Sequence, residues 1–515
     1  MGKSADHPLL APLSSLPAYQ DLLTGLREGD HTGGSLRGLG LPRSVRLALL
    51  AALHLDLEKP ILLLTNRADR ALSLFDELGF WMPEGTNLYF AEPNPSFYED
   101  LPWSEGTRHD RLRVLTEFGR YWLPGDVAPP KPSVVIAPIR AAMTRTIPRR
   151  DFLRNTLRIR LAEQRDLMET SENLVRLGYE YSNIVVRPGQ FSRRGGILDA
   201  WSHSSPWPVR IEFFGPEIDT LRLFDPATQR TTEKLDQAVL FPASEALALN
   251  TPEDGELPCQ PTGREIATLY RFPSSLVDYL PREALVLLDG QEFIEAAAND
   301  IEEESSERRA SLVANKSLEQ NAPIPYLTWS ELADSLSQRQ MLELGHTNAE
   351  GGSSLSVNFW PGPRFAGRLK EFQYYIDTLC TENLLWTVVS RQAARLRQLW
   401  TESHPDVDGE ETKIRFVEGS ISGGWVLKQG KIHQHLLSDS EIFGWSRPQP
   451  RRRPRLSSEA PETVYADLKP GDWVVHVDHG IGQFIGLHTP NIEGVQREYL
   501  SIAYKDNDVL YVPIH

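Results

Sequence analysis

Residues 468–515 read LKPGDWVVHVDHGIGQFIGLHTPNIEGVQREYLSIAYKDNDVLYVPIH and contain four short runs rich in β-branched and aromatic residues, at 473–477, 482–487, 498–504 and 509–513. Such runs, separated by Gly, Asp and Asn, predict the strands of a small, strongly bent antiparallel barrel. Gly480 and Gly482 give the backbone freedom where a strand bends at a barrel corner. The pattern leaves open whether this SH3-like barrel is only architectural or has a binding role.

The composition predicts a multidomain protein. A chain of 515 residues, 40% of them hydrophobic, is too long for one core and predicts about three to five domains. The net charge of −16 argues against a surface that is wholly a nucleic-acid groove. No run approaches the roughly 20 apolar residues that span a bilayer, so we expect a cytoplasmic protein without a membrane partner. Cys259 and Cys380 lie far apart and indicate neither a disulfide framework nor a zinc site.

The first domain has the rhythm of a parallel α/β fold without its nucleotide motifs. A helix starting near Ser44, an apolar strand at 61–64 and a helix at 68–78 predict a buried parallel sheet. A phosphate-binding loop requires GxxxxGK[ST], but the glycine-rich segment before Ser44 reads GLGLPRSVR. The strand at 284–288 ends in Asp289-Gly290, where an active motor has Asp-Glu. Two eroded motifs exclude nucleotide hydrolysis by this domain, while loose anion binding at the helix start stays open.

Alternating strand patterns dominate the segment 140–245. Apolar residues recur at every second position, and Gly195-Gly196 and Gly215-Pro216 predict hairpin turns. Arg194, Arg210 and Glu212 alternate with these core residues, so we expect all three side chains to face outward. By pattern alone they belong either to an interface or to a plain solvated surface.

The other segments carry weaker signals. We expect residues 1–40 to be poor in helix, 88–115 to be loop-like, and the acidic segment 299–309 to be an exposed helix or loop. After a Gly-Ser break, strands are predicted at 355–359, 384–389 and 414–417 and helices at 372–381 and 391–401, which makes a second small α/β unit. The basic, proline-rich run at 447–455 favours an extended linker over a DNA contact.

Three motifs resemble the N-terminal half of the bacterial transcription-repair coupling factors. VVHxxHGIGxFxG followed by EYLxIxYxxxDxLYVP resembles the RNA-polymerase-interacting module of CarD and of these factors. Residues 171–201, 209–231 and 241–245 resemble domain 2 of UvrB and of the coupling factors, the docking surface for UvrA. SDSEIFGW at 438–445 resembles the end of domain 3. The sequence also departs from the family, since one family arginine of domain 2 is replaced by Ser192.

The resemblance implies an α/β multidomain fold. A degenerate P-loop-type parallel-sheet domain is split by an α+β insert and followed by a small α/β domain and a truncated SH3/Tudor-like β-barrel. The implied divisions are domain 1a (1–139), domain 2 (140–245), domain 1b (246–350), domain 3 (351–446), a basic linker (447–466) and the polymerase-interacting domain (467–515).

The function implied by the resemblance is that of an adaptor in transcription-coupled nucleotide excision repair. Its partners would be UvrA, contacted by Arg194, Arg210 and Glu212, and the RNA polymerase β subunit, contacted by Ile492 and by one of Tyr499 and Leu500, since strand alternation turns the other inward. In the family a DNA translocase motor follows, so we expect this chain to be a fragment without a catalytic site, cofactor or metal. ATP, magnesium and most DNA binding would then belong to the motor. Two alternatives are a stand-alone CarD-like regulator and an active UvrB-like helicase.

Overall fold

The computed structural model describes most of the chain, in two compact units that are treated separately below. The first unit comprises residues 1–156 and 244–453, and the second comprises 157–243 and 454–515. The described residues are 3–29, 37–82, 85–99, 101–123, 132–247, 262–270, 272–345, 355–379, 384–403, 414–429, 432–447, 470–476, 480–488, 491–492, 495–496, 499–504 and 509–513. No helix within these ranges is both long and apolar enough to cross a membrane.

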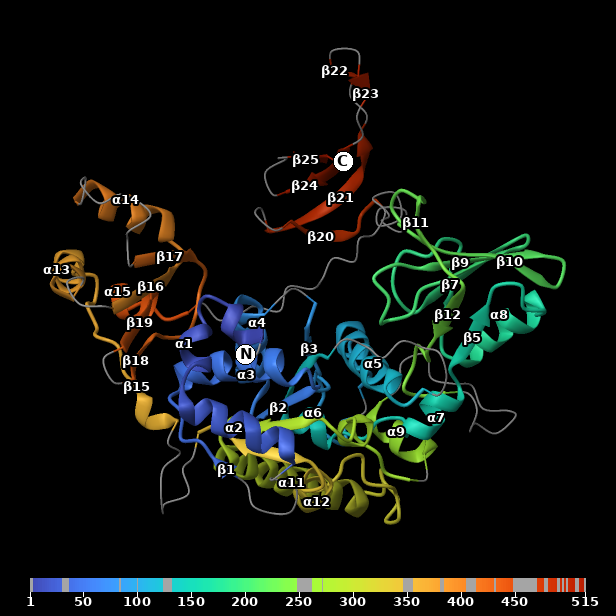
Figure 1. The fold of residues 1–515 in the computed structure, drawn as a ribbon. Coiled ribbons are helices and arrows are strands. Elements are labelled where there is room, and N and C mark those ends of the chain that lie inside the picture. Colours follow the sequence, from blue (N-terminus) through green and yellow to red (C-terminus); the bar gives the residue numbers. More distant parts are fainter. Residues whose placement is uncertain are drawn as a thin grey trace. The chain divides into compact units, whose positions relative to one another are not determined.

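A six-stranded, wholly parallel sheet forms the centre of the first unit, as the sequence predicts (Figure 1). Its strands, in spatial order, are β1 (Arg37–Gly38), β14 (Gln340–Glu343), β13 (Leu285–Leu288), β2 (Ile61–Thr65), β4 (Val134–Pro138) and β3 (Asn87–Tyr89). Strand β13 lies next to β2, and β14 lies next to β13, although the whole segment 157–243 separates both from β2 in the chain. One domain is therefore interrupted by an insert.

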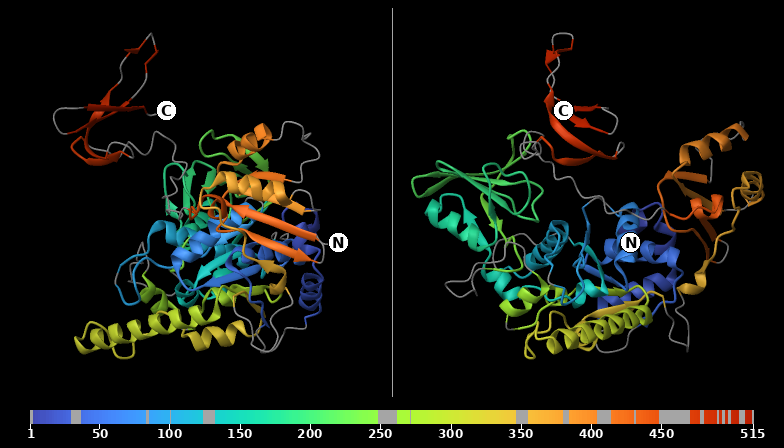
Figure 2. Two further views of the ribbon diagram at one scale, coloured as in Figure 1. Left: turned by 90° about the vertical axis from the view of Figure 1, so that its left-hand side faces the viewer. Right: turned by 180° about the vertical axis from the view of Figure 1, so that it is seen from behind.

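Helices lie on both sides of this sheet (Figure 2). Their bounds are α1 (Ala11–Ser14), α2 (Pro17–Glu28), α3 (Arg43–Leu57), α4 (Ala68–Trp81), α5 (Glu105–Arg120), α6 (Ile139–Met143), α7 (Arg149–Arg154), α9 (Gly263–Leu269), α10 (Leu276–Tyr279), α11 (Gln291–Ala314) and α12 (Trp329–Leu336). Alternate residues of β2 explain this layering. Ile61 and Leu63 join the core cluster of α2, α3 and α4, whereas Leu62 and Leu64 are buried on the opposite face.

Two expectations for this unit are wrong. Residues 1–40 are not poor in helix, because α2 begins with Pro17 at its first turn, ends at a left-handed Gly29 and buries Tyr19, Leu22 and Leu26. Residues 88–115 are not one loop, since Ser104 caps α5 by accepting a hydrogen bond from the Thr107 amide. The acidic segment 299–309 lies within α11, which agrees with an exposed helix.

A second, mixed sheet completes the first unit. Its strands, in spatial order, are β15 (Phe359–Trp360), β18 (Trp425–Gln429), β19 (Ile432–Ser438), β16 (Leu384–Ser390) and β17 (Ile414–Glu418), with helices α13 (Leu369–Leu379), α14 (Ala393–Ser403) and α15 (Asp439–Phe443). The strand expected at 355–359 is instead a 3-10 turn, Ser356–Asn358, that leads into β15. Trp425 stacks on Trp81 of α4, with ring centroids 5.7 Å apart, so this domain shares a core with the first.

The insert in the second unit begins at Leu157, later than the expected position 140, because α6 and α7 belong to the first unit. A six-stranded sheet has the order β11 (Thr231–Lys234), β10 (Glu217–Phe224), β9 (Val209–Phe214), β8 (Ile197–Ala200), β7 (Gln190–Arg194) and β6 (Glu180–Tyr181). Helix α8 (Leu167–Arg176) and the pair β5 (Leu157–Arg160) and β12 (Gln237–Leu240) contribute Leu174, Ile159 and Leu240 to its core.

The C-terminal segment contains a four-stranded antiparallel sheet, as predicted: β20 (Trp473–His476), β21 (Gly480–His488), β24 (Tyr499–Ala503) and β25 (Val509–Pro513). A small hairpin, β22 (Asn491–Ile492) with β23 (Val495–Gln496), lies between β21 and β24 in the chain. Gly482 is required by close packing, because a Cβ there would meet the side chain of Ile502 at 2.5 Å.

Candidate protein-docking surface

The outer face of the insert sheet carries the predicted charged residues. Strand pairing places Asp199 opposite Arg210 and Ile197 opposite both Arg194 and Glu212, so these side chains share one face. The neighbouring residues Leu198 and Ile211 point to the other face, where they are buried in the core of the insert. Alternation along β7, β8 and β9 therefore builds a polar face opposite the core.

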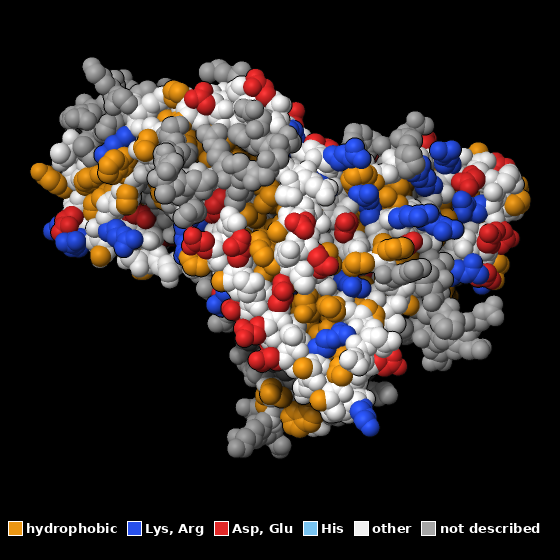
Figure 3. Space-filling view, turned by 90° about the horizontal axis from the view of Figure 1, so that it is seen from below, with side chains coloured by type: hydrophobic (Ala, Val, Ile, Leu, Met, Phe, Trp, Pro, Cys, Tyr) orange, Lys and Arg blue, Asp and Glu red, His pale blue; other side chains and the backbone are white. Residues whose placement is uncertain are grey.

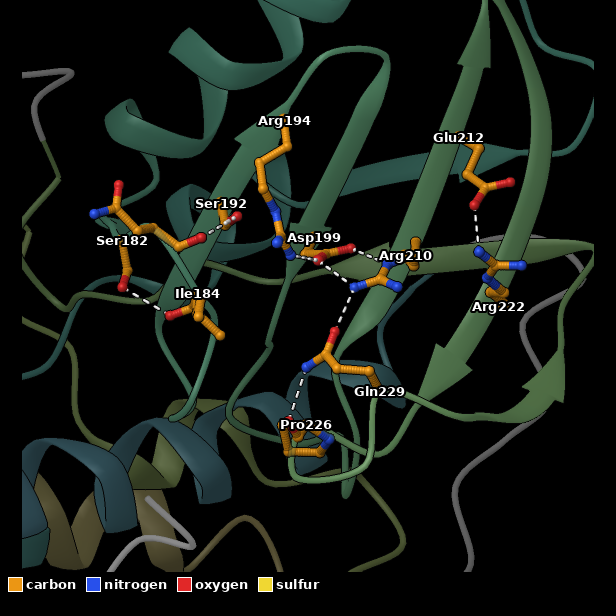
Figure 4. Close-up of polar contacts among 11 residues, drawn as sticks. Ser182, Ile184, Ser192, Arg194, Asp199, Arg210, Glu212, Arg222, Pro226 and Gln229 are labelled. Carbon is orange, nitrogen blue, oxygen red and sulfur yellow. Dashed lines mark hydrogen bonds and ion pairs between the residues drawn. The ribbon is translucent and has the colours of Figure 1, made fainter. Parts of the chain in front are cut away.

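A buried carboxylate binds the arginines of this face (Figure 4). The side chain of Asp199 is 2% exposed, and both its oxygens accept hydrogen bonds from Arg210, at 2.7 Å each. A nitrogen of Arg194 lies 3.5 Å from the same carboxylate. The hydrogen bonds to Asp199 raise the pKa of Arg210, although burial opposes the shift. Arg210 also lies 4.2 Å above the Phe224 ring and donates to Gln229, so it is fixed on three sides.

The three predicted residues therefore differ in exposure. Arg194 faces outward as expected, with 53% of its side chain exposed. Arg210 does not, because only 13% is exposed and its guanidinium is used within the sheet. Glu212 is half-buried and accepts hydrogen bonds from Thr220 and Arg222. Ser192 is buried and donates to the carbonyl of Asn183.

Phe214 was missed by the sequence reasoning. It ends β9, directly before the Gly215-Pro216 turn, and its side chain is 80% exposed. The alternation that placed Arg210 and Glu212 on the outer face extends by one further step to Phe214. A large exposed aromatic on the same face as an exposed arginine is the composition typical of an interface anchor.

The barrel residues are placed unequally. Leu500 is 7% exposed and faces the interior, so of the pair Tyr499 and Leu500 it is the inward member. Ile492 lies in β22 and Tyr499 in β24, but their side chains lie outside the described part of the structure. Exposed apolar side chains occur instead on β20, β21 and β25, at Trp473, Ile481, Ile485 and Val509.

The end of β13, where the sequence lacks the Asp-Glu of an active motor, is occupied by side chains of the protein. Asp289, at the end of β13, binds Arg46 of α3 at 2.5 Å and Arg70 of α4 at 2.8 Å. The guanidinium of Arg46 lies so close to Gly345 that a Cβ there would clash with it. Among the described residues, no group of His, Cys, Asp or Glu side chains has the arrangement of a metal site.

Comparison with protein families defines the class of two segments. Residues 157–245 match the model of the UvrB interaction domain, and residues 468–515 match that of the CarD-like/TRCF RID domain. Both matches fall on the segments that carry the two resemblances described above. The first also begins at Leu157, where the structure begins the insert.

Whole-chain similarity points to one kind of protein. The chain is 25% identical to the transcription-repair-coupling factor of Bacillus subtilis, over 96% of this chain and 46% of the relative. The corresponding factors of Staphylococcus haemolyticus and Staphylococcus aureus are each 24% identical, over 92% of this chain and 44% of theirs. The chain thus spans about half the length of the curated relatives it matches. The predicted resemblance to the coupling factors is confirmed.

Proposed function

We propose that this chain is the adaptor part of a transcription-repair coupling factor, which binds RNA polymerase stalled at a DNA lesion and recruits UvrA. The insert would dock UvrA, and the C-terminal barrel would bind the polymerase β subunit. The similarity to coupling factors extends over 92–96% of the chain and so supports this function over that of a stand-alone CarD-like regulator, which would match only in the barrel.

The outer face of the insert carries the UvrA proposal. Arg194 and Phe214 are exposed on rigid strands, and the Asp199 carboxylate that contacts Arg194 is itself fixed by two hydrogen bonds. A side chain that is held before binding loses little conformational entropy in a complex. Arg210 would then contribute indirectly, by fixing Asp199, and Glu212 by fixing Arg222.

ATP hydrolysis and DNA translocation would belong to the rest of the longer relatives. The Arg46–Asp289 pair supports a parallel-sheet domain without cofactor or magnesium, because it occupies the carboxylate that would hold the metal in an active motor. The same pair argues against an active UvrB-like helicase. The barrel would grip polymerase by strand pairing and apolar anchors, for which Trp473 and Ile481 are exposed and Ile492 and Tyr499 remain candidates.

The decisive experiment is a titration of purified UvrA with this chain and its variants. Arg194→Glu is expected to cost more than about 2 kcal/mol of binding free energy, because it places a repelling charge in a desolvated contact. Phe214→Ala is expected to cost about 1–3 kcal/mol, as for a buried aromatic anchor. Phe214 is exposed, so Phe214→Ala should keep the wild-type thermal midpoint. Arg194→Glu sets a second carboxylate near Asp199 and should lower the midpoint, so binding is compared at a temperature at which all variants are folded.

A matched control is Arg176→Glu, which makes the same charge change at an exposed position on α8, on the core side of the sheet. It should leave UvrA affinity unchanged. If Arg176→Glu weakens binding as much as Arg194→Glu, only net charge matters and the docking face is refuted. If the wild type does not bind UvrA at all, the insert is architectural.

A further inference from the structure

Two arginines and a tryptophan bind successive carbonyls at the end of α10. Arg149 donates to the carbonyl of Asp278 at 2.6 Å, Trp122 to that of Tyr279 at 2.9 Å, and Arg339 to that of Leu280 at 3.2 Å. The guanidinium of Arg149 also lies 3.6 Å above the Trp122 ring. Each guanidinium is thus held in a fixed position by one hydrogen bond.

A third guanidinium completes a cluster of like charges. Arg282 follows α10 and is exposed. Burial lowers the pKa of Arg149, and the positive charges of Arg339 and Arg282 lower it further. The pKa of Arg339 is likewise lowered by burial and by Arg282. Three guanidinium groups therefore repel one another at this site, and their proximity has an energetic cost.

One nearby carboxylate offsets part of the charge of the cluster. Asp278 raises the pKa of both Arg149 and Arg339, more strongly than any neighbouring arginine lowers it, and it also accepts hydrogen bonds from Ser274 and from the Ser275 amide at the start of α10. Three guanidinium groups face this one carboxylate, so the cluster keeps an excess of positive charge. Glu283 acts on Tyr121. In the described part of the chain, no carboxylate lies within 4 Å of the guanidinium groups of Arg149, Arg282 or Arg339.

Capping of α10 explains only part of this arrangement. Cations at a helix C-terminus stabilise its free carbonyls, which accounts for Arg149 and Arg339. It does not account for Arg282, which donates no hydrogen bond to any described residue. The Nε of Arg339 is buried and has no partner either. The cluster therefore has charge and donors that the fold does not use.

The net charge of the chain does not contradict a local basic site. Figure 3 shows acidic and basic side chains both present on the face seen from below. Exposed residues of α11 include Glu303, Glu304 and Glu307. Two further exposed arginines, Arg150 and Arg154, lie on the same short helix as Arg149.

We propose that Arg149, Arg282 and Arg339 form a binding site for a phosphate group of a nucleic-acid backbone. Guanidinium groups bind phosphate oxygens through paired, charge-assisted hydrogen bonds, and a single phosphate can accept from several of them. A backbone is the source that fits best, because its phosphates recur along the strand and can also meet Arg150 and Arg154. Such contacts give affinity without sequence preference.

The test uses the whole chain and a fluorescent duplex of about 20 base pairs, followed by anisotropy at several salt concentrations. Arg282→Glu is expected to raise the Kd about tenfold and to lower the slope of log K against log salt by about one. Arg149→Lys retains the charge and should have a smaller effect on Kd. Arg282→Glu removes a charge that repels Arg149 and Arg339, so the thermal midpoint of this variant should not fall below that of the wild type.

Arg395→Glu is the matched control, because it makes the same charge change at an exposed site on α14. If it weakens DNA binding as much as Arg282→Glu does, the effect is one of net charge and the site is refuted. Two more probes identify the ligand. Arg282-dependent binding of inorganic phosphate without DNA binding would overturn the backbone assignment, as would binding of a poly-glutamate peptide in preference to the duplex.

Discussion

Two aspartates in different regions each bind two arginines, with opposite results. In the parallel-sheet domain, Asp289 binds Arg46 and Arg70, whose side chains are 11% and 25% exposed. In the insert, Asp199 binds Arg210, which is equally buried, and Arg194, which is half exposed. The first group has its charges enclosed in the fold, whereas the second leaves one arginine half exposed to solvent.

The difference shows that an aspartate bound to two arginines can be wholly enclosed in the fold or can leave one arginine exposed to solvent. A buried carboxylate needs a cation nearby, since leaving it unpaired costs several kcal/mol. Where both arginines are enclosed, the group serves stability, and here it occupies the end of β13, at which an active motor holds magnesium. Where one arginine extends into solvent, the same carboxylate would support a binding residue if the proposed docking face is correct.

The largest expected effect is that of Asp289→Ala. It leaves two enclosed arginines without their anion, so we expect a loss of about 3–5 kcal/mol in the free energy of unfolding of the first unit. Urea denaturation would measure this loss. Asp69→Ala is the control, because Asp69 pairs with Arg67 at a site where both are more than half exposed, and it should cost less than about 1 kcal/mol. Equal losses would remove the distinction between enclosed and exposed groups.

Asp199→Ala should have a smaller effect on stability and a larger one on binding. Arg194 can turn to water, so only Arg210 is left unsatisfied, at a cost of about 1–3 kcal/mol. UvrA affinity should fall as well, because Arg194 loses its support. Hydrogen exchange of the β8 and β9 amides reports the first quantity and UvrA titration the second. Asp219→Ala, at an exposed position on β10, should change neither. Unchanged UvrA affinity in Asp199→Ala would show that Arg194 needs no support.

The fold was predictable where periodicity is strong. The apolar strands β2 and β13 and the alternating strands of the insert and barrel are confirmed within the described residues. Helix α2 was missed although Pro17 and Gly29 mark its ends, because the glycines that follow it suggested a loop. The strand expected at 355–359 was wrong. Its apolar residues alternate as they would in a strand, but the segment forms a turn that buries only Leu355 and Phe359.

The sequence predicts which residues of the candidate site share a face of the sheet. It does not predict which of them are exposed and which bind one another. Alternation indicates which residues share a face, and Arg194, Arg210 and Glu212 do share one, but of the three only Arg194 is exposed on it as expected. It cannot show that Asp199, a neighbour across two strands, takes up Arg210 and leaves Arg194 exposed, because that pairing depends on strand register. Phe214 was overlooked because an aromatic in a strand is normally read as core.

A third buried carboxylate also has an arginine nearby, but the two charged groups lie farther apart than in the first two cases. Glu77 of α4 is buried, accepts hydrogen bonds from the Ser422 amide and hydroxyl, and lies 3.9 Å from Arg447. Burial raises its pKa above the ordinary value of 4.5, although Ser422, Arg447 and Arg70 oppose the shift. The folded protein therefore favours protonated Glu77. Its contribution to stability is full below about pH 4.5 and is lost as the pH rises through the folded pKa.

Glu77→Gln keeps an oxygen for Ser422 and removes the titration, which makes it the smallest but most specific change of the three. We expect the wild type to lose thermal stability relative to Glu77→Gln as the pH rises above about 4.5, by less than either aspartate substitution costs. Calorimetry at matched ionic strength would measure the difference. Asp76→Asn, at an exposed neighbour that also pairs with Arg447, should follow the wild-type profile. Parallel pH profiles for the wild type and Glu77→Gln would mean that an arginine at 3.9 Å compensates a buried carboxylate as well as the closer arginines of Asp289 and Asp199 do.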